Sequence, residues 1–458
     1  NEQCDDGNIN NSDGCSSTCI IEPPLSLSNI IQRLSSTGVF LANHSTIQSC
    51  ANSVTAGQTC LVYPGVYNER VTPVNSGSSG NLIKFKASTK GSVLMQGFSL
   101  SKDYISVDGF NITNSLTAYT TSLNTGGISI SGSYLAISNN YIYNLRSTGI
   151  FTIDSLKVPN VPNSVSIINN TIKRSNQGIV VKGNNWIISG NEVDRLIVYA
   201  DDPQSDDADY IRFFGNNNTF SRNYFHGTIV GEIGSSHVDC WQTFGDNGEW
   251  ASNTVIDSNI CDGFYHEGLM SSSDGVLGFD NLIISNNVFA NSASWGLVVG
   301  NPNTKVYHNV FYNMTNNGVG FRVQSGVFNG INGIVKNNIF YNAPSGGPHA
   351  IHFIDNDAYS YTASKNLLYD SRGTIDSSYT SGNSFSNYAA DIRNKNPLFV
   401  NVNNLVGSDD IPFTNDDGYR IQTGSPTINA GTNVGVSKDI LGNSRPKGAG
   451  YDIGAYEY

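Results

Sequence analysis

The sequence predicts an all-β solenoid, a parallel β-helix with an N-terminal helical cap and a C-terminal cap. A short motif recurs through the middle of the chain: two or three apolar residues, a polar residue, Asn, and an aromatic or aliphatic pair. A Gly follows this Asn at a nearly constant distance in several repeats. Two landmarks at fixed spacing, with β-branched and aromatic residues between them, indicate coils of short strands joined at Asn and Gly corners.

The motif Asn residues lie 21 to 36 residues apart, which matches one coil plus a loop of variable length. Stacked at one corner, their side chains are expected to form an amide ladder. A β-propeller is rejected because it needs four strands in a repeat of about 40 to 50 residues. The motif Asn residues are Asn140, Asn170, Asn191, Asn223, Asn259, Asn287, Asn309 and Asn338, and the Gly residues that follow are Gly149, Gly178, Gly268, Gly296 and Gly318.

The chain divides into four regions. We predict a Cys-rich disulfide module over residues 1–22, an N-terminal cap with the first coils over 23–80, the parallel β-helix over 81–394 and a C-terminal cap over 395–458. Segments 26–38 and 44–54 are predicted to form short amphipathic helices that plug the first coil, the second capped at His44 or Ser45. From residue 395 the Asn motif gives way to segments such as PLFVNV and GYDIGAYEY.

Charge and hydropathy exclude several partners. The chain has 37 acidic against 25 basic residues and a net charge of −12, so it offers no basic field for nucleic acid. No run approaches the roughly 18 apolar residues of a membrane span. We expect a soluble protein whose partner is a polysaccharide or oligosaccharide, and its oligomeric state stays open.

The cysteines favour an extracellular location, secreted or at the cell surface. They fall in short-range groups, as expected of disulfides, and no C-x-x-C pair points to zinc. The chain begins with Asn rather than Met, as expected if a secretory signal has been removed. One Cys of the first group is left without a partner nearby. The groups are Cys4, Cys15 and Cys19; Cys50 and Cys60; and Cys240 and Cys261.

Residues 1–22 place Asp5, Asp6 and Asp13 among the first three cysteines. Clustered carboxylates at short spacing could hold calcium, although a disulfide-tied surface module is the favoured interpretation. The DDGN and DGC segments resemble the short Cys-rich repeats of secreted bacterial and archaeal proteins.

The repeat breaks after Asn191 and Asn223, where polar residues replace the Gly landmark. Segment 209–215 aligns with 239–245, and 267–270 falls in step with both. In that register Asp209, Asp239 and Glu267 form a column of carboxylates about 4.8 Å apart. Like charges so close raise one pKa, which supplies a general acid beside a base or nucleophile. Such spacing suits glycoside hydrolysis.

Other polar and aromatic residues around this column complete the predicted site. The additional catalytic candidates are His237, which could share protons, and Asp246, which also fits an ordinary turn. The predicted substrate-binding residues could bind hydroxyls or a uronate, or stack on sugar rings, though each aromatic is at least equally expected in the core. They are Arg212, Gln242, Trp241, Tyr210, Tyr265, His266 and Trp250.

The insertion from Asp201 to Asp209 holds five Asp in nine residues. It fits a calcium site and a solvated acidic loop about equally. Its predicted metal ligands are Asp201, Asp202, Asp206 and Asp207. A hydrolase would require no cofactor, whereas a lyase would be expected to use Ca²⁺.

From about Ser45 to Tyr458 the chain resembles the pectate-lyase-like superfamily of secreted right-handed parallel β-helix proteins. The opening TIQSCANSVTAGQTCLVYPGVYNERV and the ending SPTINAG with DILGNSRPKGAGYDIGAYEY carry this resemblance. It implies a right-handed β-helix and leaves the reaction open among polysaccharide lyases, glycoside hydrolases, epimerases and non-catalytic adhesins.

The resemblance implies that a lyase would use Lys or Arg as its base, yet no Lys lies between Lys182 and Lys305. The sequence therefore favours a secreted glycoside hydrolase with stacked Asp and Glu carboxylates in a groove. The first alternative is a calcium-dependent lyase acting on a uronic-acid glycan, drawing on Arg212, Arg222, His237 or the coil of Lys182. The second is a non-catalytic adhesin, glycan-binding or filament protein.

Overall fold

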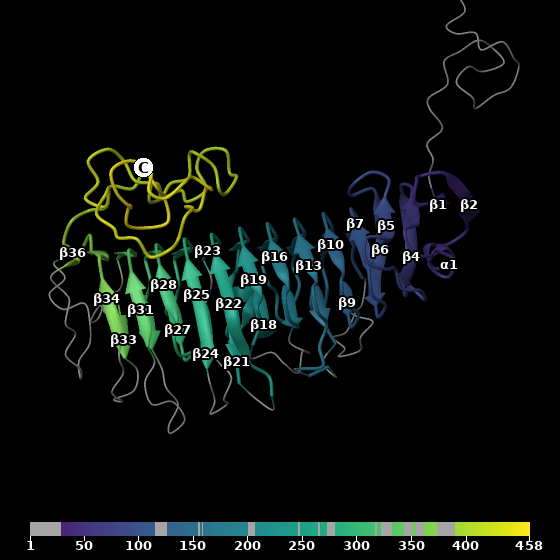
Figure 1. The fold of residues 1–458 in the computed structure, drawn as a ribbon, viewed down its shortest axis with the longest axis horizontal. Helices are drawn as coiled ribbons and strands as arrows, with labels where there is room; N and C mark the ends of the chain where they lie inside the picture. Colours follow the sequence, from purple (N-terminus) through teal and green to yellow (C-terminus); the bar gives the residue numbers. More distant parts are fainter. Residues whose placement is uncertain are drawn as a thin grey trace, which may run out of the picture.

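The protein is a right-handed parallel β-helix whose coils stack along one axis (Figure 1). The computed structural model describes residues 29–114, 126–153, 156–157, 159–199, 207–245, 248–263, 266–272, 280–316, 318–321, 332–342, 351–353, 361–372 and 390–458. The predicted Cys-rich module over 1–22 lies outside these residues, as do Asp201, Asp202, Asp206, Asp246 and Tyr265.

Each regular coil contributes one strand to each of three parallel sheets. The first sheet contains β3 (Thr59–Val62), β5 (Ile83–Ala87), β7 (Ile105–Asp108), β10 (Ala136–Ser138), β13 (Ser166–Ile168), β16 (Ile187–Ser189), β19 (Thr219–Ser221), β22 (Ala251–Asp257), β25 (Asp280–Ser285), β28 (Lys305–Tyr307), β31 (Gly333–Lys336) and β34 (Tyr361–Ser364).

The second sheet follows across the Asn corner. It contains β4 (Gly65–Val71), β6 (Val93–Leu100), β8 (Asn111–Ile112), β11 (Tyr141–Tyr143), β14 (Thr171–Lys173), β17 (Glu192–Asp194), β20 (Tyr224–His226), β23 (Ile260–Asp262), β26 (Val288–Ala290), β29 (Val310–Tyr312), β32 (Ile339–Tyr341), β35 (Leu367–Tyr369) and β36 (Ile392–Arg393).

The third sheet follows the Gly landmark and carries the candidate site. It contains β9 (Ile128–Ile130), β12 (Ile150–Thr152), β15 (Ile179–Lys182), β18 (Ile211–Asn216), β21 (Trp241–Phe244), β24 (Leu269–Ser272), β27 (Leu297–Val299), β30 (Val319–Phe321) and β33 (Ile351–Phe353). Two strands span a corner: β6 pairs with both β8 and β9, and β18 pairs with both β21 and β22.

The predicted amide ladder is present at the corner between the first and second sheets. In each step an Asn Oδ1 accepts hydrogen bonds from the backbone N–H and the side-chain amide of the Asn one coil earlier. Asn191, for example, accepts both from Asn170, at 2.9 and 3.0 Å. All eight predicted Asn residues take part, and the ladder continues through Asn366 to Asp391. Asn366 was missed, although it follows Asn338 by one coil length of 28 residues.

Gly recurs at nearly the same place in each coil because successive coils approach each other closely there. At Gly268 an added Cβ would lie 2.3 Å from the carbonyl oxygen of Gly296 and 2.5 Å from the Phe289 ring. Gly178 meets the carbonyl oxygen of Tyr210 in the same way, at 2.3 Å. A side chain at either position would therefore push the next coil away.

The N-terminal cap contains one of the two predicted helices. Helix α1 (Ile47–Ala51) begins after Thr46, not at His44 or Ser45, because Thr46 Oγ1 accepts the Ser49 N–H at 2.9 Å. The helix predicted over 26–38 is wrong. Residues Ile31–Leu34 form β1, which pairs antiparallel with β2 (Phe40–His44) and β3. Pairing with the open edge of β3 outweighs the helical pattern because it satisfies backbone groups that would otherwise be left unpaired.

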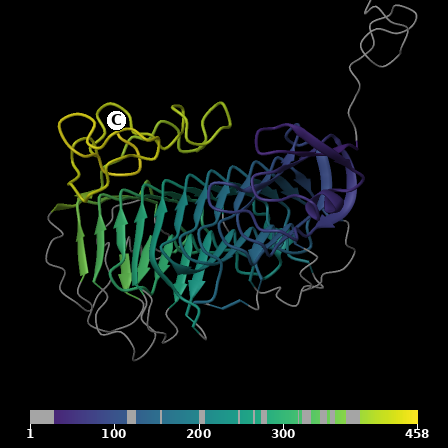
Figure 2. The same ribbon diagram turned by 45° about the vertical axis from the view of Figure 1, so that its right-hand side comes forward.

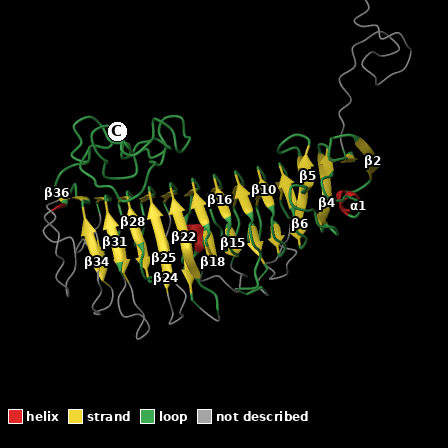
Figure 3. Cartoon of the chain, viewed as in Figure 1, coloured by secondary structure: helices red, strands yellow, loops and turns green. Residues whose placement is uncertain are grey.

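The predicted C-terminal cap lies alongside the last coils as loops (Figures 2 and 3). It packs on the outer face of the second sheet. The outward residues there turn apolar, and they share a core with C-terminal side chains such as Tyr419 and Tyr456. These outward residues are Ile260, Val288, Val310, Ile339 and Leu367. Buried Arg445 fastens the segment by pairing with Glu457 at 2.6 Å and donating to Asn286 Oδ1 at 3.0 Å.

Two further features concern the predicted class of protein. Cys50–Cys60 and Cys240–Cys261 both form disulfides, as the sequence grouping predicted. Among the described residues, no helix has the length and apolar character needed to cross a membrane. The other described helix, α2 (Val230–Ile233), is a single turn in the loop after β20.

We predict that Asn259→Ala destabilises the protein by about 2–4 kcal/mol, because it leaves the buried N–H and amide of Asn223 without their shared acceptor. Thermal and urea unfolding measure the change. Exposed Asn403, replaced by Ala, is the matched control and should unfold like the wild type. Equal loss in both variants would show that the ladder adds nothing specific.

Candidate functional site

The predicted register of the three irregular coils is confirmed. Ile211 pairs with Trp241 and Arg212 with Gln242, while Trp241 pairs with Leu269 and Gln242 with Met270. Asp209, Asp239 and Glu267 therefore occupy the same position in successive coils, just before β18, β21 and β24. The N–H of Glu267 donates to Asp239 Oδ1 at 2.8 Å, which joins two members of the column directly.

The carboxylate column is buried. Asp209, Asp239 and Glu267 are 0%, 1% and 4% exposed. Burial is the main cause that raises the pKa of Asp209, to about 7, against the opposing charge of Arg212. Burial, and then the negative charges of Asp209 and Asp207, raise the pKa of Asp239 well above its usual range. The column therefore provides carboxyl groups whose burial favours the protonated form.

Arg212, predicted to bind substrate, pairs instead with carboxylates in and beside the column. Its guanidinium pairs with Asp207 at 2.5 Å and with Asp209 at 2.7 Å. Asp207 also accepts a hydrogen bond from Gln242 at 3.1 Å. Asp207 is thus engaged by protein groups, and it is the one predicted calcium ligand among the described residues.

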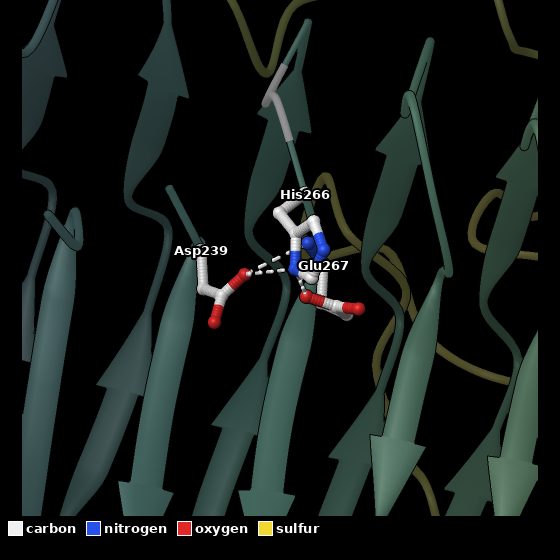
Figure 4. Close-up of side chains that lie close together, drawn as sticks. All are labelled: Asp239, His266 and Glu267. Atoms are coloured by element: carbon white, nitrogen blue, oxygen red, sulfur yellow. Dashed lines mark hydrogen bonds and ion pairs between the residues drawn. The ribbon is translucent and has the colours of Figure 1, made fainter. Parts of the chain in front are cut away.

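Two stacked histidines lie beside the column. The rings of His237 and His266 are 4.1 Å apart and nearly parallel. His266 Nδ1 contacts Glu267 Oε2 and lies 3.8 Å from Asp239 Oδ1, so the three side chains converge (Figure 4). Partial burial, and then the charge of His237, lower the pKa of His266 to about 4. Its imidazole is therefore neutral near pH 7.

A cavity of about 360 Å³ opens over these groups on the outer face of the third sheet. Its size is that of a small ligand site. The sequence missed Trp295, Met270 and Val298. Trp295 precedes Gly296 as Glu267 precedes Gly268, so the coil register would have placed it next in the column. The lining residues are His237, Asp239, Gln242, His266, Glu267, Met270, Trp295 and Val298.

Several predicted sugar-stacking residues lie elsewhere. Tyr210 and Trp241 are fully buried, so they are core residues and not platforms. Trp241 takes the inward position of its strand and packs against Phe225 with ring centroids 4.8 Å apart. Trp250 is half-buried at the corner before β22, where its carbonyl oxygen accepts the Gly215 N–H at 2.6 Å. The described lining of the cavity does not include it.

The lysine nearest in sequence is also committed to the fold. Lys182, on β15, is 7% exposed and pairs with Glu249 at 3.0 Å. The disulfide between Cys240 and Cys261 ties the segment that bears Asp239, just before β21, to β23 of the second sheet. It therefore joins the candidate site to the second-sheet strand of the following coil.

Asp239, His266 and Glu267 could also hold a cation. One ligand atom from each lies within 4.8 Å of the others. Glu267 Oε2 is buried, and the described side chain that it contacts is His266, a member of the same set. The imidazole makes the set better suited to Zn²⁺ or Mn²⁺ than to Ca²⁺, which prefers oxygen ligands.

Comparisons with known proteins identify the fold and no family. No family model and no curated protein matches the chain. Among solved structures, it is similar to pectate lyase Pel9A, with a TM-score of 0.51 and 16% identity over 89% of this chain and 90% of that one. It is also similar to XylC, solved with xylose, with a TM-score of 0.52 and 12% identity over 90% and 95% of the two chains.

We predict that Asp239→Asn melts at a higher temperature than the wild type at pH 8, and that the gain disappears by pH 4. The raised pKa means that the folded protein retains a proton that the unfolded chain releases above about pH 4. Wild-type stability therefore falls as pH rises, whereas Asn carries no ionisation cost and keeps the acceptor for Glu267. Calorimetric melting temperatures at several pH values measure the difference. If the melting temperature of Asp239→Asn relative to wild type were lower at pH 8 than at pH 4, the raised pKa of Asp239 would be contradicted.

Proposed function

We propose that the protein is an extracellular polysaccharide lyase that cleaves a uronic-acid glycan on the outer face of the third sheet. The observation that carries this proposal is the cavity in which a buried carboxyl of raised pKa faces two imidazoles. Elimination from a uronate needs a proton acceptor beside the sugar carboxylate and a proton donor at the leaving oxygen. The cavity contains groups of both kinds.

His237 is the proposed base. It is exposed at the cavity, and its ring stacks on neutral His266. It takes the proton from the carbon beside the uronate carboxylate. The neighbouring carbon–oxygen bond then breaks, a carbon–carbon double bond forms, and protonated Asp239 gives its proton to the leaving oxygen. Because Lys182 is paired with Glu249, histidine takes the role that the sequence resemblance assigns to Lys or Arg.

The substrate carboxylate must be neutralised for this elimination. Arg212 is already shared by Asp207 and Asp209, so a cation held by His266 and Glu267, beside the protonated Asp239, is the proposed source of charge. Bound there, a divalent cation would withdraw electrons from the uronate carboxylate and acidify the adjacent carbon. Ca²⁺ prefers oxygen ligands, and this donor set contains an imidazole. A requirement for Ca²⁺ therefore remains an untested prediction.

Glycoside hydrolysis is the second candidate. It is favoured by the closeness of Asp239 and Glu267, whose carboxylate oxygens lie within 4.8 Å of each other. Carboxyl groups about 5 Å apart suit a retaining hydrolase. The similar structure XylC was solved with xylose, a neutral sugar, whereas Pel9A is described as a pectate lyase. Both similarities concern the fold, so the chemistry of the cavity decides between the two reactions.

We predict that uronic-acid polysaccharides such as polygalacturonate or alginate yield unsaturated products, lighter by one water than hydrolysis products. Asp239→Asn should lower the rate by about 10²–10⁴-fold, the usual contribution of a positioned acid or base. Mass spectrometry of the products measures this. Exposed Asp280 on the first sheet, replaced by Asn, is the control and should retain activity.

The same product analysis separates the alternatives. Products that carry added water, from neutral or acidic glycans, would establish hydrolysis. Binding without cleavage of any polysaccharide in the panel would favour the non-catalytic adhesin or filament function.

The rate should fall on the alkaline side of its pH profile, because Asp239 donates a proton only while protonated and its pKa is raised. We expect kcat/KM to decline as Asp239 ionises. A profile that rises steadily into alkali would contradict Asp239 as the acid.

A further inference from the structure

A second cavity, of about 580 Å³, lies between the second sheet and the C-terminal segment. Its floor is formed by outward side chains of β17 and β20, namely Glu192, Tyr224 and His226. Its roof is formed by residues 410–413, including Ile411 and Phe413. The candidate active site lies on the third sheet, so the two cavities occupy different faces of the β-helix.

The cavity marks the place where the C-terminal segment stops covering the sheet. Beyond Tyr224, the outward residues at the start of each strand are apolar and buried beneath that segment, beginning with Ile260. Before Tyr224, the same positions hold Glu192 and Thr171, which are partly exposed. Tyr224 itself is partly buried and packs against the C-terminal core. Its ring therefore forms a boundary between an apolar wall and a polar open floor.

The polar groups of the floor are held in place before any ligand arrives. His226 Nε2 lies 2.9 Å from Glu192 Oε1, and the His226 ring stacks on Tyr224 at 4.0 Å. This hydrogen bond is the largest cause that lowers the pKa of Glu192, which therefore remains a carboxylate. Arg222 lies over the Phe413 ring at 4.9 Å and donates to the Ile440 carbonyl oxygen at 3.0 Å. Groups fixed in this way lose little entropy on binding.

The roof has an unfavourable backbone for its side chains. Asp410 and Phe413 have φ values of 55° and 67°, a region that a bulky residue such as Phe rarely adopts. Ile411 between them is 56% exposed at the cavity. The strained Phe413 and the exposed side chain of Ile411 are not needed to bury this segment, and such features recur where loops clamp a ligand.

We propose that this cavity is a second, non-catalytic binding site for an oligosaccharide segment of a polysaccharide. A sugar ring presents one apolar face of C–H groups and a rim of hydroxyls. The Tyr224 ring and Ile411 match the face, while Glu192, Asp410 and the Arg222 guanidinium match the rim. The choice of a saccharide over other amphipathic ligands rests on the proposed function. Such a site would hold the polymer to the enzyme while another stretch enters the third-sheet cavity.

The test measures binding in the full-length Asp239→Asn protein, so that the probe is not cleaved. The probes are polygalacturonate, alginate and xylan, each studied by affinity electrophoresis and calorimetry. Adding Tyr224→Ala should weaken binding to the preferred probe by about tenfold, and Glu192→Gln should weaken it several-fold. Tyr143→Ala is the matched control. Tyr143 also points outward from the second sheet and stacks on a ring of its own strand, but it does not line the cavity.

Melting temperatures show whether each variant is folded. If Tyr224→Ala is unfolded, Glu192→Gln still tests the proposal. Unchanged binding in folded Tyr224→Ala and Glu192→Gln would overturn the proposal, as would binding to none of the probes. Cleavage by proteins with Asp239 intact separates the two proposals. Tyr224-dependent binding without any cleavage would support this site and contradict the lyase. With cleavage present, Tyr224→Ala should raise KM for the polymer and leave kcat on short oligosaccharides unchanged.

Discussion

The hydrogen bonds between successive coils determine where every functional group of this protein lies. Parallel strands stack at about 4.8 Å, so residues one coil apart in sequence become neighbours in space. The amide ladder fixes this register, because the side chain of each Asn from Asn140 onward donates to the Asn of the next coil. The proximity of Asp209, Asp239 and Glu267 follows from that register and not from any local turn. The carboxyl groups are thereby held together although their charges repel.

Much of this arrangement could be predicted from the sequence, because a repeat converts sequence spacing into spatial position. The ladder, the two disulfides and the alignment of 209–215 with 239–245 all follow from counting residues. The direction of side chains was harder. Trp241 aligns with Ile211 and Leu269, which are both buried, so the alignment already indicated an inward position. Its aromatic side chain nevertheless suggested a sugar-stacking role.

Other features were beyond single-sequence reasoning. The pattern of residues 31–34 suits a helix or a strand, and only the open edge of β3 decides between them. Side chains of the second sheet alternate inward and outward as in any strand. The outward residues differ from those of an exposed strand only in being apolar. Their partner, the segment after residue 395, is distant in sequence and has no repeat of its own. The chemistry of the cavity depends on such long-range facts, including the pairing of Lys182 with Glu249 and of Arg212 with two aspartates.

The way in which the C-terminal segment is attached bears on how the molecule assembles. Each coil needs only its neighbour, so coils can form one after another as the chain is synthesised. Arg445, in contrast, reaches Asn286, a residue 159 positions earlier. The second-sheet face under this segment must therefore stay uncovered until the last residues have been made. During that interval an apolar strip that includes Val288, Val310 and Ile339 is open to water and exposed to aggregation, and this exposure ends only when the final 60 or so residues cover the strip.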